Sequence, residues 1–161
     1  MAPTTHSAVI AALRAVGVAP DAYGPTLNTA QSPRDVDVVG EGLAGEIRAV
    51  AAPAALLVWD TSDEAVLAHV VARYLDIGVL RAFEVEGLLG VSPDIPAGAP
   101  VALLATQWGE RRLANLRTLV ANRGGQTVAV AAALTSPALA AVTDVPTAAL
   151  ASSDEVTGVP S

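Results

Sequence analysis

The chain of 161 residues contains no lysine and no cysteine, and each absence removes whole classes of chemistry. Without lysine, the protein cannot form a lysine Schiff base, hold a phosphate with a Walker-type lysine or use a lysine general base. Without cysteine, it has no disulfides, no thiolate metal ligands and no thiol nucleophile. Any catalysis must therefore rest on other side chains.

Positive charge is scarce as well. Nine arginines stand against sixteen aspartates and glutamates, which gives a net charge of −7. Because nucleic-acid binding rests on clustered cations, this balance argues against a DNA or RNA partner. The two histidines, His6 and His69, are too far apart in the sequence to indicate a zinc site. We therefore predict no metal site and no nucleic-acid partner.

Long apolar runs are also missing. The longest, residues 49–59, includes Pro53 and is much shorter than the ~20 residues that a membrane-spanning helix needs. The first residues lack the apolar stretch and small-residue cleavage site of a secretory signal. We expect no membrane association and a cytoplasmic location.

Hydrophobic residues, in contrast, make up 52% of the chain, and charged residues only 16%. This composition predicts a single domain at residues 1–150, with N-terminal helices and a loop or hood at 1–54, an α/β core at 55–150 and a flexible tail at 151–161. So high an apolar fraction also predicts exposed apolar surface. We therefore expect a homo-oligomer, such as a dimer, or a subunit of a larger assembly.

Short apolar runs alternate with periodic segments along the chain. Strands are predicted at 55–59, 78–83, 101–105, 127–134 and 145–150, and helices at 63–75 and 109–122, near the N-terminus up to Gly17, and at 41–51 after a loop-like stretch at 19–39. Buried strands that alternate with helices predict an α/β fold, a mainly parallel sheet flanked by helices with an N-terminal helix and loop cap.

Ligands of such sheets bind at the carboxyl ends of the strands. These ends fall at residues 60–62, 83–87 and 105–112. The candidate ligand-pocket residues are Thr61, Ser62, Glu86, Gly87, Thr106, Gln107, Trp108, Gly109, Arg111 and Arg112. We predict no catalytic residue among them.

Several of these side chains admit two interpretations. Trp59 and Trp108 follow strands, and each is either a stacking platform or plug in the crevice or an ordinary core residue. Arg111 and Arg112 either hold an anion or pair at the surface. Arg81, within an apolar strand, is expected to meet a carboxylate or a partner subunit.

The order of elements over residues 55–150 resembles the type I phosphoribosyltransferases, particularly their adenine and orotate branch. The residues from Ala65 to Leu75, followed by Gly78 and Val79, resemble the helix and strand after the pyrophosphate loop. Residues 96–104 are similar to the approach to the phosphoribosyl-pyrophosphate strand, and 123–131 to the helix-to-strand segment after it. The resemblance implies the type I phosphoribosyltransferase-like fold.

The segments that carry the family's chemistry differ. The family's signature strand ends in two acidic residues, where this chain has Ala105 and Thr106. A glycine-rich turn around the 5′-phosphate should follow, but Arg111 and Arg112 stand in place of its glycines. A ribose diol and its magnesium would therefore lack their acceptor oxygens.

The pyrophosphate loop departs in the same way, because Asp60, Asp63 and Glu64 place negative charge where the pyrophosphate would lie. We predict a phosphoribosyltransferase-like pseudoenzyme of nucleotide metabolism, acting as a non-catalytic binding, regulatory or assembly subunit without a cofactor. Two alternatives remain: a divergent active phosphoribosyltransferase of nucleobase salvage, which would need magnesium, and a sensor of a nucleotide or sugar phosphate. A phosphorylated small molecule is the expected ligand.

Overall fold

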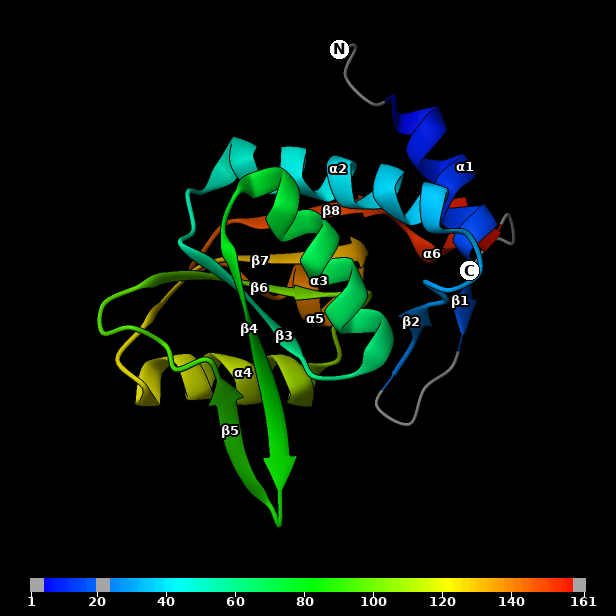
Figure 1. The fold of residues 1–161 in the computed structure, drawn as a ribbon. Helices are drawn as coiled ribbons and strands as arrows, with labels where there is room; N and C mark the ends of the chain where they lie inside the picture. Colours follow the sequence, from blue (N-terminus) through cyan, green and yellow to red (C-terminus); the bar gives the residue numbers. More distant parts are fainter. Residues whose placement is uncertain (1–4, 20–23, 158–161) are drawn as a thin grey trace.

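The computed structural model describes residues 5–19 and 24–157 (Figure 1). In chain order the elements are α1 (His6–Val16), β1 (Val18–Ala19), β2 (Thr26–Leu27), α2 (Pro33–Val50), β3 (Ala55–Trp59), α3 (Ser62–Leu75), β4 (Gly78–Val85), β5 (Leu88–Ser92), β6 (Pro100–Ala105), α4 (Glu110–Asn122), β7 (Gln126–Leu134), α5 (Pro137–Ala140), β8 (Thr147–Ala151) and α6 (Ser153–Thr157).

Six strands form one sheet in the order β5-β4-β3-β6-β7-β8. All neighbours are parallel except β4 and β5, which form an antiparallel hairpin. The strand runs Ala55–Trp59 and Pro100–Ala105 lie at the centre of the sheet and are almost wholly buried, as a sheet covered on both faces requires. The predicted α/β class is confirmed.

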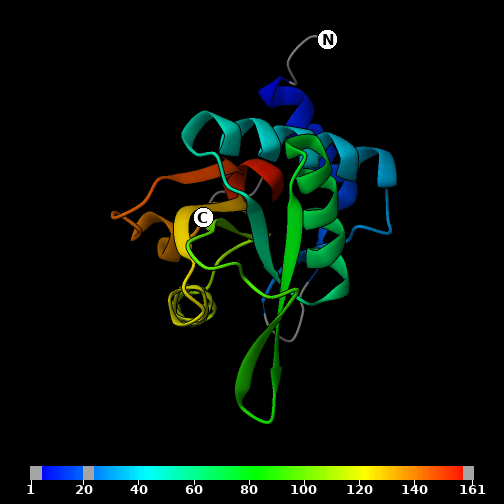
Figure 2. The ribbon, with the colours of Figure 1, turned by 60° about the vertical axis from the view of Figure 1, so that its left-hand side comes forward.

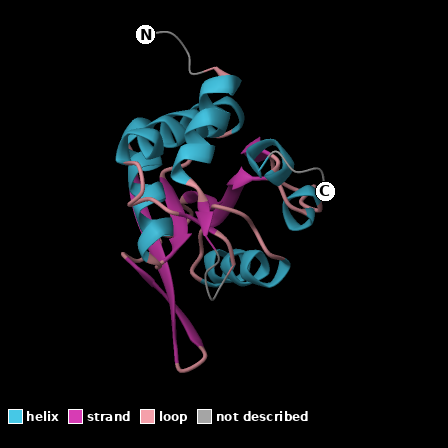
Figure 3. Ribbon diagram, turned by 90° about the vertical axis from the view of Figure 1, so that its right-hand side faces the viewer, coloured by secondary structure: helices cyan, strands magenta, loops and turns pink. Residues whose placement is uncertain are grey.

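Helices cover both faces of the sheet (Figure 3). α1, α2 and α3 pack on one face, around a core that includes Leu43, Leu56 and Leu67. α4 and α5 pack on the other, around Leu57, Leu103 and Leu116. The hairpin of β4 and β5 projects beyond this layered body (Figures 1 and 2).

The β4–β5 hairpin differs from the prediction, in which the strand ends at residue 83 and no second strand follows it before residue 101. β4 continues to Val85, and a two-residue turn at Glu86 and Gly87 leads directly into β5. Both turn residues have positive φ, 52° and 80°, as the tightest hairpin turns require. The two residues at the turn, rather than a longer loop, set the register.

α2 also differs from its prediction, because it begins at Pro33 and not near residue 41. Pro33 occupies a first-turn position, where its missing N–H costs nothing. At Gly40 a Cβ would stand 2.3 Å from Val70 Cγ1 of α3, so glycine allows the two helices to approach closely. This glycine has a packing role inside a segment that otherwise looks like a loop.

The C-terminal prediction needs a correction as well. Ala151 is the last residue of β8, and Ser153–Thr157 form α6, whereas the sequence analysis assigned 151–161 to a flexible tail. His6 and Arg14 of α1 hold α6 through Glu155 and the carbonyl of Val156. Residues 158–161 lie outside the described residues.

Candidate functional site

The first turn of α3 lies at the carboxyl edge of the sheet because α3 starts directly after β3. Its Glu64 points into the protein and is buried. Both carboxylate oxygens of Glu64 accept from the backbone N–H of Thr106, at 3.2 and 3.0 Å, and the Thr106 hydroxyl also donates to Glu64. Thr106, the residue after β6, is fully buried. The end of the central strand is thus held by an internal carboxylate.

Two further contacts join this edge to the hood segment, residues 24–32. The backbone N–H of Leu27 donates to Thr106 Oγ1 at 3.1 Å. Asp63, beside Glu64, accepts from the N–H of Thr29 at 3.1 Å and from its hydroxyl at 2.5 Å. Asp63 and Thr106 therefore fix the hood segment to the core.

Burial changes the acidity of Glu64. Desolvation raises the pKa of its carboxyl above the ordinary value of 4.5. The hydrogen bonds from Thr106 and the charge of Arg112 act in the opposite direction but do not cancel the effect. The stability of the folded protein therefore depends on whether the Glu64 carboxyl is protonated.

The residues between β6 and α4 also turn inward. Gln107 Nε2 donates to the carbonyl of Thr135 at 3.0 Å and to Ser153 Oγ at 3.1 Å. Trp108 is only 3% exposed, and its Nε1 donates to the carbonyl of Ala131 in β7 at 2.8 Å. Gly109 takes the N-cap position of α4 without a capping side chain. Trp108 is thus a buried residue with a hydrogen bond.

A cavity of about 260 Å³ borders this turn. Its lining residues are Gly24, Pro25, Gln107, Trp108, Gly109, Ser136 and Pro137. It lies where the hood segment approaches the carboxyl ends of β6 and β7.

A larger cleft of about 810 Å³ lies between α4 and the β4–β5 hairpin. Trp59, at the end of β3, lines it, and the guanidinium carbon of Arg112 lies 4.9 Å from the centroid of the Trp59 ring. This distance is within the range of a cation–π contact. Arg111 and Asn115 also line the α4 side of the cleft.

The hairpin side of the same cleft is acidic. Glu84 and Glu86 line it, with Asp60 at the end of β3. Asp60 lies 3.8 Å from the guanidinium of Arg81, so the expected carboxylate partner of Arg81 is present. The cleft therefore presents arginines on one side and carboxylates on the other.

Two polar atoms beside this cleft lack a hydrogen-bond partner. Among the described residues, Trp59 Nε1 and Thr61 Oγ1 are the buried side-chain atoms in this condition. Thr61 stands at the N-cap of α3, but its hydroxyl makes no capping hydrogen bond, contrary to the capping role that residues of its type usually play. Trp59 is the last residue of β3, and Thr61 follows it two positions later.

The structure divides the sequence-predicted site residues between two places. Thr61, Glu86, Gly87, Arg111 and Arg112 line the larger cleft, whereas Gln107, Trp108 and Gly109 line the smaller cavity. Ser62 begins α3 and Thr106 is buried, and neither lines either cavity.

Sequence reasoning missed Asn115 and the burial of Glu64. A signal for Glu64 existed, because it lies on the same helical face as Ala68 and Val71, both buried. For Asn115 no signal was available, since its place depends on how α4 faces the hairpin.

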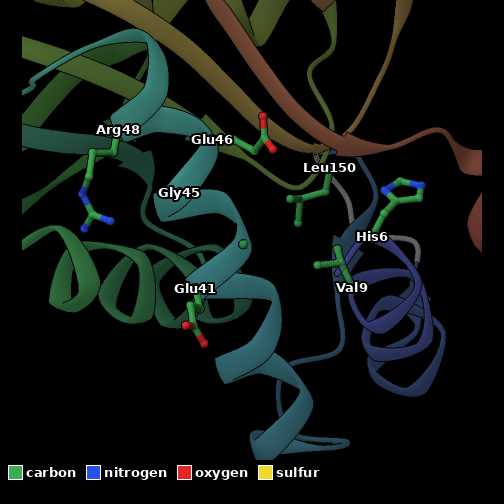
Figure 4. Close-up of a pocket in the computed structure, with 8 residues that line it drawn as sticks. His6, Val9, Glu41, Gly45, Glu46, Arg48 and Leu150 are labelled. Atoms are coloured by element: carbon green, nitrogen blue, oxygen red, sulfur yellow. The ribbon is translucent and has the colours of Figure 1, made fainter. Parts of the chain in front are cut away.

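A third cavity, of about 400 Å³, lies between α1, α2 and β8 (Figure 4). Val9 and Leu150 face it, and Glu41 and Glu46 project from α2 beside it. At Gly45 a Cβ would meet no atom within 4 Å, so the helix surface is open there. None of the sequence-predicted site residues lines this cavity.

The described residues contain neither a metal-binding cluster nor a membrane-spanning helix. In the ranges 5–19 and 24–157 no group of three or more histidines and acids is placed to hold a metal ion. Within the same part of the chain, no helix combines the length and the apolar character needed to cross a bilayer.

At the level of sequence, no protein-family model matches the chain, and no curated protein is similar to it. Solved structures, in contrast, match over nearly the whole chain. The orotate phosphoribosyltransferase of Mycobacterium tuberculosis superposes with a TM-score of 0.72 at 12% identity, covering 98% of this chain and 92% of that one.

Two further structures agree. A phosphoribosyltransferase from Corynebacterium diphtheriae gives a TM-score of 0.75 at 11% identity and covers 94% of this chain and 98% of that one. The UMP synthase of Leishmania donovani gives 0.76 at 10% identity, but this chain, covered to 97%, spans only 38% of its length. On these superpositions, the chain has the fold of the type I phosphoribosyltransferases.

Proposed function

We propose that this protein uses the phosphoribosyltransferase fold to bind a ligand or a partner and does not transfer phosphoribosyl groups. The main support is the pairing of Glu64 with Thr106, the residue that stands where the resemblance implies the second acid of the signature pair. Thr106 is buried, and its N–H and hydroxyl are already bonded to Glu64. No carboxylate is offered to a ribose at this position.

The turn after β6 adds support. Gln107 and Trp108 direct their side-chain N–H groups to protein acceptors, and Trp108 is buried. Arg111 and Arg112, in the first turn of α4, line the larger cleft. Of the residues that replace the phosphate turn, Gln107 and Trp108 are thus bonded to the protein itself, and Arg111 and Arg112 line a different cavity.

The larger cleft is the binding place that we assign to the ligand. Arg111 and Arg112 supply guanidinium groups, which bind phosphate or carboxylate groups through paired N–H donors. Trp59 supplies an aromatic surface beside them. A phosphorylated small molecule fits this chemistry, and the proposal requires no magnesium and no other cofactor. A cytoplasmic location remains a prediction.

A thermal-shift screen against phosphoribosyl pyrophosphate, nucleotides and sugar phosphates, with and without magnesium, tests this assignment. A ligand at 100 times its Kd stabilises the folded state by about 2.7 kcal/mol, which is easily measured. We expect a magnesium-independent shift that Arg111→Gln reduces, while Arg123→Gln, a change at an exposed arginine outside the cleft, leaves it intact. A shift that depends on magnesium and is insensitive to Arg111→Gln would instead favour an active salvage transferase.

A further inference from the structure

The larger cleft carries unpaired charges of opposite sign on its two walls. Arg111 lies on the α4 wall, and Glu84 and Glu86 lie on the hairpin wall. None of these three side chains forms an ion pair with any of the described residues. The positive and negative groups therefore line the same space without neutralising one another.

The pleat of β4 directs Glu84 to the cleft. Leu80 and Ala82 alternate with exposed residues of the strand and are buried on the α4 side of the sheet. Because residues two apart on a strand share a face, Glu84 continues this row beyond the core. Leu89, its cross-strand partner, lines the same cleft. The Glu84 carboxylate thus belongs to the cleft and not to the outer face of the hairpin.

The floor of the cleft, formed by Trp59 and Thr61, adds two polar atoms that no described residue satisfies. Trp59 is 9% exposed and its indole N–H has no acceptor, and the Thr61 hydroxyl has no partner. Buried polar groups nearly always have a partner, because an unsatisfied one costs stability. Arg112 lies over the Trp59 ring, so an anion that draws its guanidinium away would open the indole to an acceptor on the same ligand. Hydroxyl and ether oxygens fit this floor.

We propose that the ligand of this cleft is a phosphorylated amino sugar, with its phosphate toward Arg111 and its ammonium group toward Glu84 and Glu86. This inference rests on the proposed function and narrows the phosphorylated small molecule to one that carries both charges. A guanidinium binds phosphate through paired N–H donors, and carboxylates bind an ammonium group by charge-assisted hydrogen bonds. The sugar oxygens between the two charged groups meet the floor. A ligand with a phosphate alone would be repelled by the hairpin carboxylates.

A matched series of sugars tests the assignment by isothermal titration calorimetry of the full chain, without magnesium and at neutral pH, where the amine is protonated. We expect glucosamine 6-phosphate to bind about tenfold more tightly than glucose 6-phosphate, which has a hydroxyl in place of the amine. N-Acetylglucosamine 6-phosphate, whose nitrogen is uncharged, should also lose this advantage.

Equal affinity for glucosamine 6-phosphate and glucose 6-phosphate would overturn the inference and leave the proposed function intact. Binding of neither sugar phosphate would overturn the inference as well, and the thermal-shift screen then shows whether the proposed function also fails. The two failures are therefore distinguishable.

Substitutions separate the two ends of the ligand. Arg111→Gln should weaken the binding of both phosphates, whereas Glu84→Gln with Glu86→Gln should remove the preference for glucosamine 6-phosphate. Both glutamates are exposed, so the double variant should fold, and thermal melting checks this. Glu46→Gln is the matched control, because Glu46 is an exposed glutamate of α2 outside the cleft. A preference that persists in the double variant, or that the control loses to the same extent, would contradict the placing of the ammonium group at the hairpin.

Discussion

Glu64 and Thr106, 42 residues apart in the chain, are joined by hydrogen bonds to both the backbone N–H and the hydroxyl of Thr106. Thr106 also accepts from Leu27, so one buried threonine links α3, the end of β6 and the hood segment. Because the resemblance implies a ligand-binding acid at this position, the contact bears on both stability and function.

Loss of the Glu64 carboxylate should destabilise the protein through the groups that it leaves behind. In Glu64→Ala the buried N–H and hydroxyl of Thr106 lose their acceptor, which costs about 1–3 kcal/mol for each unsatisfied group. Glu64→Gln keeps one acceptor oxygen and should cost less. Urea unfolding measures both differences, and equal stability of the Ala variant and the wild type would refute the role of this contact.

The raised pKa of Glu64 predicts a dependence of stability on pH. A carboxyl whose pKa is higher in the folded protein binds its proton more tightly there than in the unfolded chain. Its contribution to stability is therefore greatest below about pH 4.5 and declines as the pH rises through the raised folded pKa. Relative to Glu64→Gln, the wild type should lose stability over this rise in pH. A difference in unfolding free energy that stays constant with pH would contradict the prediction.

Restoring the acidic pair should harm the fold rather than create activity. In Thr106→Asp a second carboxylate would lie against that of Glu64 in a buried place, where like charges are strongly unfavourable. We expect a large loss of thermal stability for Ala105→Asp with Thr106→Asp, and no transferase activity. Adding Glu64→Gln should recover part of the stability. Magnesium-dependent binding of phosphoribosyl pyrophosphate by the double variant would mean that an intact pocket remains.

The two tryptophans provide a matched pair of substitutions. Trp108→Ala should cost ~3–5 kcal/mol, because a large buried aromatic is removed. Trp108→Phe leaves the carbonyl of Ala131 without its donor, whereas Trp59→Phe removes an N–H that has no partner. Trp108→Phe should therefore be the more destabilising of the two by about 1–3 kcal/mol in denaturant unfolding. A larger loss of stability for Trp59→Phe than for Trp108→Phe would show that the hydrogen bond of the Trp108 indole N–H does not stabilise the fold as proposed.

The elements that could be predicted are those with a local signature. Continuous apolar runs predict the strands Ala55–Trp59 and Pro100–Ala105, and helical periodicity predicts α4. α2 was predicted too short because its first turns, Pro33 to Val39, belong to a stretch rich in Pro, Gly, Asn, Asp and Ser that was predicted to be a loop. The hairpin was missed because its turn, Glu86 and Gly87, lacks the usual Asn-Gly or Asp-Gly pair.

The candidate site was harder to predict than the fold. The carboxyl ends of β3 and β6 were located correctly from their apolar runs, whereas β4 extends two residues beyond its predicted end. The partition of the predicted residues between two cavities depends on side-chain contacts across the chain, such as Leu27 with Thr106 and Asp63 with Thr29. Such long-range hydrogen bonds leave no periodic pattern in a single sequence.

The most direct test of the central claim is a transferase assay with phosphoribosyl pyrophosphate, magnesium and, in turn, adenine, guanine, hypoxanthine and orotate. A phosphoribosyltransferase of known activity, assayed alongside, establishes that the conditions support turnover. Because Thr106 is engaged by Glu64 and Trp108 is buried, we predict no nucleotide formation above the rate without enzyme. Robust formation of a nucleotide from any of the four bases would contradict the account and identify an active transferase.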